Sequence, residues 1–329
     1  MKTKSIKSIG VLTSGGDSPG MNAAIRAVVR TGINFGLDMY GIYRGYNGLI
    51  EDEISKMDSK SVANIIQRGG TILKTARSKD FLTIEGRQKA YKNLKKHGIQ
   101  GLVIIGGDGS FRGAQVFSKE FNIPVIGIPG TIDKDMSGTD YTIGFDTAVN
   151  TAVWAIDKIR DTADAHDRMF VVEVMGRDAG YIALYSGIAT GAEHILIPES
   201  KTNMEKLVAD FNKKEHRKKS FNLIVVAEGD EFGGANNVAD YLKSHLDNLD
   251  IKVCILGHIQ RGGSPSCFDR IIASRMGFHA VECLLFGYSN VMVGIVNNEM
   301  AFTPLDIAVI KEKHTISRDW FKVIKRLCK

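Results

Sequence analysis

The sequence predicts an α/β fold made of parallel sheets whose two faces are both covered by helices, with two such units in the chain. Three observations support this prediction. Short apolar runs that read as strands alternate with segments of helical periodicity. The runs are apolar without alternation, which is typical of strands buried on both faces of a parallel sheet. They are more numerous than one sheet usually needs, so a second α/β unit is expected within the 329 residues.

The expected elements follow in order along the chain. A strand over 9–13 leads through a Gly-rich turn into a helix over 21–35, and a strand over 102–105 leads through two glycines into a helix over 111–117. Further strands are expected at 125–128, 169–174, 194–197, 223–227 and 253–256, with helical patterns in the intervals between them. No Pro-, Gly- or Ser-rich linker marks the boundary between the two units.

The composition is that of a soluble globular protein, with 43% hydrophobic and 24% charged residues. No apolar run reaches the length of about 18 residues typical of a membrane span, and the basic N-terminus leads straight into a strand, so neither a membrane segment nor a secretory signal is expected. The four cysteines form no CxxC pair and no zinc-like spacing with His, which favours reduced thiols in a cytoplasmic protein. The net charge of +6 comes from scattered Lys and Arg, which favours anionic small molecules over nucleic acid as partners.

Gly-rich and acidic segments follow several of the expected strands, where open α/β sheets bind their ligands. Segment 13–20 (TSGGDSPG) could bring backbone N–H groups and a helix N-terminus to a phosphate. It is neither a Walker A motif nor GxGxxG, so a tight turn is an equally good interpretation. In segment 106–110 (GGDGS), a carboxylate beside a phosphate suggests a shared Mg²⁺ at Asp108, although a helix cap also explains it.

The loop over 129–135 (PGTIDKD) places Asp133 and Asp135 two residues apart. One carboxylate could meet the metal and the other accept a proton from a substrate hydroxyl, as phosphoryl transfer requires; two solvated loop acids are the alternative. Cationic residues that border strand ends or Gly-rich turns could bind phosphate or form surface ion pairs: Arg77, Arg168, Arg177 and Arg261, with His258 nearby. Arg26 and Arg30 share one helix face and indicate either a second anion site or a solvated surface.

Six motifs together resemble one known family. GGDSPGMNAAIR, GGDGS, PGTIDKD, GTDYTIGFDTA, VEVMGR and LGHIQRGGSP are similar to segments of the bacterial ATP-dependent 6-phosphofructokinases, in that family's order and spacing from about Ile9 to about Met276. The resemblance implies two Rossmann-like three-layer α/β/α domains with the active-site cleft between them. Residues 1–142 with 258–308 would form a larger ATP-binding domain, and 143–257 with 309–329 a smaller domain for fructose 6-phosphate. It also implies a homotetramer with shared active sites, and ADP or phosphoenolpyruvate as effectors.

The resemblance further implies a role for each matching residue. Asp133 would be the general base, supported by Thr131, Asp135 and Arg177, and Asp108 with Asp135 would hold Mg²⁺. The residues expected to contact ATP are Gly16, Tyr46, Arg77, Ser78, Gly107, Asp108, Gly109 and Ser110. Those expected to bind the sugar phosphate are Thr131, Ile132, Asp133, Met175, Gly176, Arg177, Glu228, Lys252, His258, Arg261 and, from a neighbouring subunit, Arg168. The expected effector site contains Arg26, Arg30, Arg160, Glu193 and Lys219.

Two positions bear on the phosphoryl donor. Pyrophosphate-dependent members tend to carry Asp and Lys where this chain has Gly109 and Gly130, and the absent side chains leave room for ATP. A pyrophosphate-dependent enzyme, a lipid or NAD kinase with GGDG, and a catalytically weak nucleotide-binding subunit are the competing hypotheses.

Three departures from the family pattern qualify these implied roles. Lys134 replaces the usual Asn between the two loop acids, and Lys252 replaces an Arg for the 6-phosphate. Glu53 stands where we expect a third effector-binding Arg, which predicts muted regulation. Trp154 is open to two interpretations, core or interface.

Overall fold

The computed structural model describes residues 6–164, 168–213, 221–246, 249–310 and 316–328. The chain forms two compact units. The first consists of Met1–Thr147 and Arg261–Lys311, and the second of Ala148–Gln260 and Glu312–Lys329. Helix α5 (Phe145–Asp164) carries the chain from the first unit into the second.

The first unit contains a seven-stranded sheet. In spatial order its strands are β11 (Glu299–Pro304), β10 (Val291–Val296), β5 (Val125–Pro129), β4 (Gly101–Gly106), β1 (Ser8–Ser14), β2 (Asp38–Ile42) and β3 (Ile54–Met57). The five inner strands pair in parallel, and the two outer strands pair antiparallel to their neighbours. The mostly parallel sheet expected from the sequence is therefore present.

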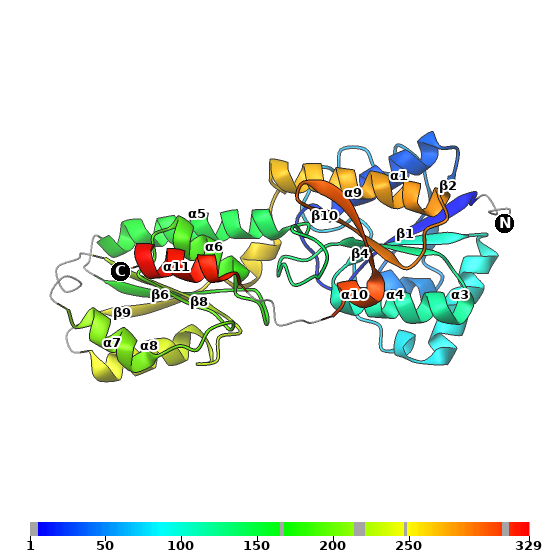
Figure 1. The fold of residues 1–329 in the computed structure, drawn as a ribbon. Coiled ribbons are helices and arrows are strands. Elements are labelled where there is room, and N and C mark those ends of the chain that lie inside the picture. The colour runs from blue at the N-terminus through cyan, green and yellow to red at the C-terminus, as the bar shows by residue number, and fades with distance from the viewer. Residues whose placement is uncertain (1–5, 165–167, 214–220, 247–248, 311–315, 329) are drawn as a thin grey trace. The chain divides into compact units, whose positions relative to one another are not determined.

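Two groups of helices cover this sheet (Figure 1). On one face lie α1 (Met21–Asn34) and α9 (Cys267–Leu285), and on the other lie α2 (Gly45–Ile50), α3 (Ile84–Lys96), α4 (Asp108–Phe121) and α10 (Leu305–Ala308). Along β4, Val103 and Ile105 pack in the first cluster, whereas Leu102 and Ile104 pack in the second. Because successive side chains of a strand point to opposite faces, a strand covered on both faces needs an unbroken apolar run.

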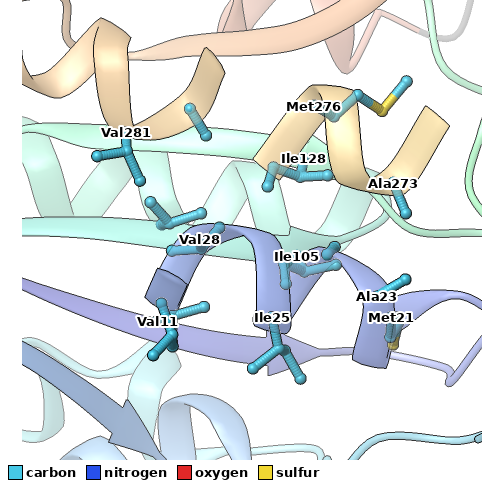
Figure 2. Close-up of a cluster of buried hydrophobic side chains, with 14 of the residues drawn as sticks. Val11, Met21, Ala23, Ile25, Val28, Ile105, Ile128, Ala273, Met276 and Val281 are labelled. Atoms are coloured by element: carbon cyan, nitrogen blue, oxygen red, sulfur yellow. The ribbon is translucent and has the colours of Figure 1, made fainter. Parts of the chain in front are cut away.

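Figure 2 shows the cluster between α1, α9 and the sheet. Ile25 and Val28 of α1 and Met276 of α9 lie near Ile105 and Ile128 of the strands, and all five side chains are fully buried. The segment that follows the first Gly-rich loop is thereby fixed to the sheet, which holds the loop in a defined place.

The second unit contains a four-stranded parallel sheet in the order β7-β8-β6-β9. Its strands are β6 (Met169–Val174), β7 (His194–Leu196), β8 (Asn222–Ala227) and β9 (Ile251–Ile255). Its helices are the larger part of α5, α6 (Tyr181–Ala189), α7 (Met204–Phe211), α8 (Gly234–His245) and α11 (Arg318–Leu327). Figure 1 shows α6 and α11 on one face of this sheet and α7 and α8 on the other, so the unit has the three expected layers.

The expectation that helical patterns fill the intervals between the expected strands is wrong for β2 and β3. β10 and β11 lie beyond the last expected strand and were not predicted. The edge strands β3 and β11 are partly exposed, so they lack the continuous apolar run used to identify strands. β10 does carry such a run, with Met292, Val293 and Ile295 buried, and could have been identified by the same rule.

The structure also shows the surroundings of Trp154, the state of the cysteines and the character of the helices. Trp154 is 60% exposed with the Lys158 ammonium 4.5 Å from its ring centre, so it does not belong to the core of this chain. The four cysteines are all free. Within the described ranges, every helix is too short or too polar to span a bilayer.

Candidate active site

The order in which strands are added to the first sheet reverses at β1, in its centre. From β1 the chain adds β2 and β3 on one side, and then β4 and β5 on the other. Ligands of open α/β sheets bind at such a switch point, beyond the carboxyl ends of the strands. Ser14 pairs with Gly106, and Gly106 pairs with Pro129, so these three strands end side by side. The structure thus brings together the three loops that follow β1, β4 and β5.

Two side chains, the Thr75 hydroxyl and the Arg261 guanidinium, donate hydrogen bonds to the loop after β1. The Thr75 hydroxyl donates to the Gly15 carbonyl (2.7 Å). Arg261 donates from Nη1 to the Asp17 carbonyl (3.2 Å), and a Cβ placed on Gly16 would lie 2.7 Å from that same nitrogen. Two residues expected to bind different substrates, Gly16 and Arg261, therefore lie against each other. An exposed glycine loop beside a guanidinium is suited to bind phosphate.

The loop after β4 opens helix α4. Asp108 is its first residue and Gly107, which has no side chain to cap the helix, is its N-cap. The positive end of the helix dipole favours an anion at this position. Gly109 is exposed, and a Cβ placed there would meet no atom within 4 Å. Ser110 is buried. Space for a ligand is therefore present directly beside the helix N-terminus.

Tyr46 supports this loop from the interior. Its ring is 6% exposed and stacks on Phe81 with the ring centres 4.0 Å apart, and its hydroxyl donates to the Ser110 carbonyl. Burial raises the pKa of the Tyr46 hydroxyl, so it remains a protonated donor. The expectation of direct contact with ATP gives way to a supporting role, because the ring lies in the core. Of the other two expected ATP residues, Arg77 is exposed and the Ser78 hydroxyl accepts from the Phe81 N–H (3.3 Å).

The loop after β5 gives its two acids different surroundings. Asp133 is 6% exposed, and its N–H donates to the Thr131 hydroxyl (3.1 Å). Ile132 is fully buried, and Asp135 is partly exposed. The residue between the acids, Lys134, has the left-handed φ of 55°, which turns the chain sharply. A buried and a more solvated carboxylate fit the two different roles expected for them.

The Lys134 ammonium, which departs from the family pattern, lies near two aromatic rings. It is 5.2 Å from the ring centre of Phe145 and 6.0 Å from that of Tyr141. Burial lowers the pKa of Lys134, and the nearby Asp140 acts in the opposite direction. The two ring faces offset part of the cost of burying this charge.

The residues present fit a Mg²⁺ ion that arrives with a phosphate ligand. Asp108 and Asp135 follow the neighbouring strands β4 and β5. In the part of the chain that the structure describes, no three His, Cys, Asp or Glu side chains cluster as a complete metal cage. Mg²⁺ usually takes one or two carboxylates, with phosphate oxygens and water as its other ligands.

A second group of expected site residues lies at the carboxyl ends of β6, β8 and β9 in the second unit. Glu228 accepts through Oε1 from the Gly176 N–H (3.3 Å) and the Arg177 N–H (2.7 Å). Gly176 and Arg177 have positive φ angles of 147° and 54°, so this turn needs such an anchor. Met175 is buried, whereas Arg177, Glu228 and His258 are exposed at this edge.

Arg168 and Lys252 lie at the opposite edge of the same sheet, next to the amino ends of β6 and β9. Asp250 pairs with both, 2.7 Å from Arg168 Nε and 2.8 Å from Lys252 Nζ. Hydrogen bonds from Lys252 and Arg168 lower the pKa of Asp250. The six residues of β6 separate this edge from Arg177 by about 20 Å. One chain therefore does not bring these two cations together with its own Arg177.

The expected effector residues are distributed over both units. In α1, Arg26 is partly exposed and Arg30 exposed. In the second unit the buried Glu193 accepts from the Leu223 N–H (2.7 Å), and the Arg160 guanidinium lies 5.3 Å from the Phe221 ring centre. Lys219 is outside the described residues.

Glu53 is paired with Arg44, whose Nε donates to Oε2 at 2.7 Å. The Glu53 carboxylate therefore has a cationic partner within the chain, and muted regulation stays a prediction.

Two residues that sequence reasoning did not select hold site segments in place. The fully buried Asp269 accepts from the Gly144 N–H (2.9 Å), the Thr147 N–H (2.8 Å) and the Thr147 hydroxyl, which caps α5 from another helix. Burial raises the pKa of Asp269 to about 6 despite these bonds. Gln260 joins two loops of the second unit. The only sequence signal for it is its position between His258 and Arg261.

Comparisons with known proteins agree on one family. Residues 8–284 match the family model described as Phosphofructokinase. The ATP-dependent 6-phosphofructokinase 2 of Bacteroides thetaiotaomicron is 54% identical over 98% of this chain and 98% of its own length. The ATP-dependent 6-phosphofructokinase of Halothermothrix orenii is 56% identical over 97% of this chain and 98% of its own length.

Solved structures show the same fold. A phosphofructokinase from Saccharomyces cerevisiae superposes with a TM-score of 0.88 and 41% identity, over 92% of this chain and 45% of the yeast chain. A pyrophosphate-dependent phosphofructokinase from Marinobacter aquaeolei superposes with a TM-score of 0.83 and 24% identity, over 96% of this chain and 88% of its own. At that identity the second likeness shows only the fold.

Proposed function

The chain belongs to the phosphofructokinase family, and we propose that it transfers the γ-phosphate of MgATP to the 1-hydroxyl of D-fructose 6-phosphate. The products are fructose 1,6-bisphosphate and ADP, so the enzyme is an ATP-dependent kinase of glycolysis. Relatives that are 54% and 56% identical over nearly the whole chain are named ATP-dependent 6-phosphofructokinases. The observation that carries the proposal is the meeting of three loops at one switch point, with the buried Asp133 among them.

The first unit is proposed to bind MgATP. The Gly-rich loop after β1 and the N-terminus of α4 offer N–H groups to the phosphates, and Arg261 adds positive charge beside Gly16. Asp108 and Asp135 would hold Mg²⁺, which when bound neutralises charge on the phosphates. Arg77, which is exposed, would contact the nucleotide.

Asp133 is proposed as the general base. Phosphoryl transfer needs little covalent help from the protein, but it needs alignment, neutralised charge and a base near the attacking oxygen. Asp133 would accept the proton of the 1-hydroxyl while that oxygen forms its bond to the γ-phosphorus and the bond to the ADP oxygen breaks. Thr131 holds the Asp133 backbone in place. Arg177 is proposed to stabilise charge on the transferring group.

The second unit is proposed to bind fructose 6-phosphate through Met175, Gly176, Arg177, Glu228 and His258. These residues share the carboxyl edge of one sheet, and Glu228 fixes the turn that carries Arg177. A sugar phosphate needs both hydrogen-bond acceptors for its hydroxyls and cations for its phosphate, and this edge offers both.

The active sites are proposed to be shared between copies in a homotetramer. Arg168 and Lys252 lie about 20 Å from Arg177 along β6, at the amino edge of the sheet, so they are suited to complete the site of a neighbouring copy. Co-expression of Arg168→Ala chains with Asp133→Ser chains tests this. Hybrid assemblies would then contain sites with neither change, and activity should return.

The matched control for this complementation mixes Asp133→Ser with Arg177→Ala chains. Asp133 and Arg177 are proposed to serve the same copy's site, so no hybrid site would escape damage and no activity should return. Absence of recovery in the first mixture would contradict shared sites.

The effector site is proposed at Arg26, Arg30, Arg160, Glu193 and Lys219. Regulation is tested by measuring activity at low fructose 6-phosphate with ADP and with phosphoenolpyruvate. The sequence predicts a muted response. A strong response would contradict that prediction and would agree with the pairing of Glu53 with Arg44.

The reaction itself is tested by fructose 1,6-bisphosphate formation with ATP or pyrophosphate as donor. The parent should use ATP and lose activity on Mg²⁺ removal, and Asp133→Ser should lower kcat by about 10²–10⁴-fold. Asp240→Ser, a change at a largely exposed acid on α8, is the control and should be unaffected. A parent that uses pyrophosphate and not ATP would overturn the choice of donor.

A further inference from the structure

One buried amide joins the two loops of the second unit that carry most of its proposed substrate residues. Gln260 lies in the 3₁₀ segment Gly257–Arg261 and is fully buried. Its Oε1 accepts from the Met175 N–H (3.2 Å), and its Nε2 donates to the Gly257 carbonyl (2.9 Å). Met175 follows β6, and Gly257 follows β9, so a single side chain connects the ends of two neighbouring strands.

The two hydrogen bonds made by residue 260 require a side chain that both accepts and donates, as an amide does. The Met175 N–H needs an acceptor and the Gly257 carbonyl needs a donor; the first of these two hydrogen bonds is buried and the second is partly buried. At neutral pH Gln and Asn offer both functions from one planar amide, and Asn is one methylene shorter; a neutral His offers both only from a ring of different shape. The two partners also fix which end of the amide faces which loop.

One of the two joined loops contains a backbone conformation that needs support, because glycine adopts positive φ freely whereas Arg177 does not. Gly257 has φ 53°, and Gly176 and Arg177 have φ 147° and 54°. Glu228 holds the N–H groups of Gly176 and Arg177, and Gln260 holds that of Met175. The segment 175–177 is therefore anchored at each of its three backbone N–H groups, two by an exposed acid and one by a buried amide.

From this we infer that Gln260 is a positioning residue for fructose 6-phosphate. It holds the segment that carries Arg177 at a fixed distance from the segment that carries His258. Both side chains can then contact the sugar phosphate at the same time. The inference rests on the proposed function of this edge. Misplacement of binding groups by about 1 Å can cost 10²-fold in rate, so loss of the link should lower kcat/KM for fructose 6-phosphate by about 10–100-fold. The KM for MgATP should rise much less than the KM for fructose 6-phosphate, because Arg261 is the only proposed ATP residue in the segment that contains Gln260.

Two variants separate positioning from folding. Gln260→Met keeps the length and removes both hydrogen bonds. Gln260→Glu removes the donor only while its carboxyl is ionised, because a protonated carboxyl accepts with one oxygen and donates with the other, as the amide does. Burial raises the pKa of such a carboxyl, so it should protonate within the assay range.

The experiment measures kcat/KM for fructose 6-phosphate and the KM for MgATP between pH 8.5 and pH 6, as ratios to the parent at each pH. The ratio for Gln260→Glu should rise towards one as the pH falls, and that for Gln260→Met should stay low and flat. Gln100→Met, a change at an exposed amide that accepts from the Lys7 N–H at the amino end of the first sheet, is the control and should match the parent.

Three results would overturn the inference: a parental KM for fructose 6-phosphate in both variants, equal losses for both substrates, or no pH-dependent recovery in Gln260→Glu. A purely structural role gives equal losses and a lower unfolding temperature without recovery. An inactive parent would overturn the proposed function and this inference with it, whereas an active parent with unaffected variants would overturn the inference alone.

Discussion

A single methyl group at Gly109 and at Gly130 should have opposite effects on stability. A Cβ at Gly109 would meet no atom within 4 Å, whereas a Cβ at Gly130 would lie 3.0 Å from both Ile105 Cγ2 and Met21 Cε. The sequence assigned the same meaning to both glycines, namely room for the nucleotide. The structure separates them, because the space at Gly130 is filled by side chains of the core.

The magnitudes follow from these surroundings. Gly109 is the second residue of α4, where Ala is favoured over Gly by about 0.5–1 kcal/mol, so Gly109→Ala should raise the unfolding temperature by about 1–4 °C. Gly130→Ala forces carbon atoms apart in a packed interior, which costs about 1–3 kcal/mol and should lower the unfolding temperature by several degrees.

Activity should move in the other direction at Gly109. If the nucleotide occupies the open space there, Gly109→Ala should raise the KM for ATP by about tenfold or more, equivalent to roughly 1.4 kcal/mol of lost binding. The KM for fructose 6-phosphate should not change. Steady-state kinetics and thermal unfolding by circular dichroism measure both effects. A stabilised Gly109→Ala enzyme with the parental KM for ATP would refute the assignment of this space to the nucleotide, and a Gly130→Ala protein as stable as the parent would refute the packing argument.

Two further predictions concern buried charge. The pKa of Asp269 is raised from 3.8 to about 6, so the folded protein keeps this proton over a range in which the unfolded chain loses it. The resulting stability, on the order of 3 kcal/mol, is present below pH 3.8 and is lost as the pH rises through about 6. Between pH 4.5 and pH 7.0 the free energy of urea unfolding should fall by about 2 kcal/mol more in the parent than in Asp269→Asn, and an equal change in both proteins would contradict this. Lys134→Asn should change kcat by less than about threefold because the ammonium is held by aromatic rings, and a tenfold gain would show instead that it suppresses the basicity of Asp133.

The fold could be predicted where burial leaves a mark on the sequence. Leu102 to Ile105 form an unbroken apolar run because helices cover both faces of β4, and the same pattern marks every inner strand of the second sheet. The edge strands β3 and β11 carry no such mark, since one side of each meets water. Their place is fixed by pairing with a neighbouring strand, which a local pattern does not encode.

The loops of the candidate site could be predicted from the sequence, but the residues that support them could not. Loops after parallel strands must gather at one edge, so the grouping of the segments after β1, β4 and β5 follows from strand order alone. The supporting residues could not be predicted in this way. Gln260 acts on Met175, 85 residues away in the sequence, and Asp269 acts on Gly144, 125 residues away. Such bonds exist only once the chain is folded, and no spacing rule anticipates them.

Strand direction places Arg168 and Arg177 at opposite edges of the second sheet. Arg177 follows β6 and Arg168 precedes it, so the six residues of one strand hold these two phosphate-binding candidates apart whatever side-chain rotamers they adopt. No local rearrangement brings both to one phosphate within a single copy of the second unit. If both arginines bind the same sugar phosphate, they must come from different copies, and Asp250 then acquires a defined task. It holds Arg168 and Lys252 as a pair at the amino edge, where the pair would be presented to another copy.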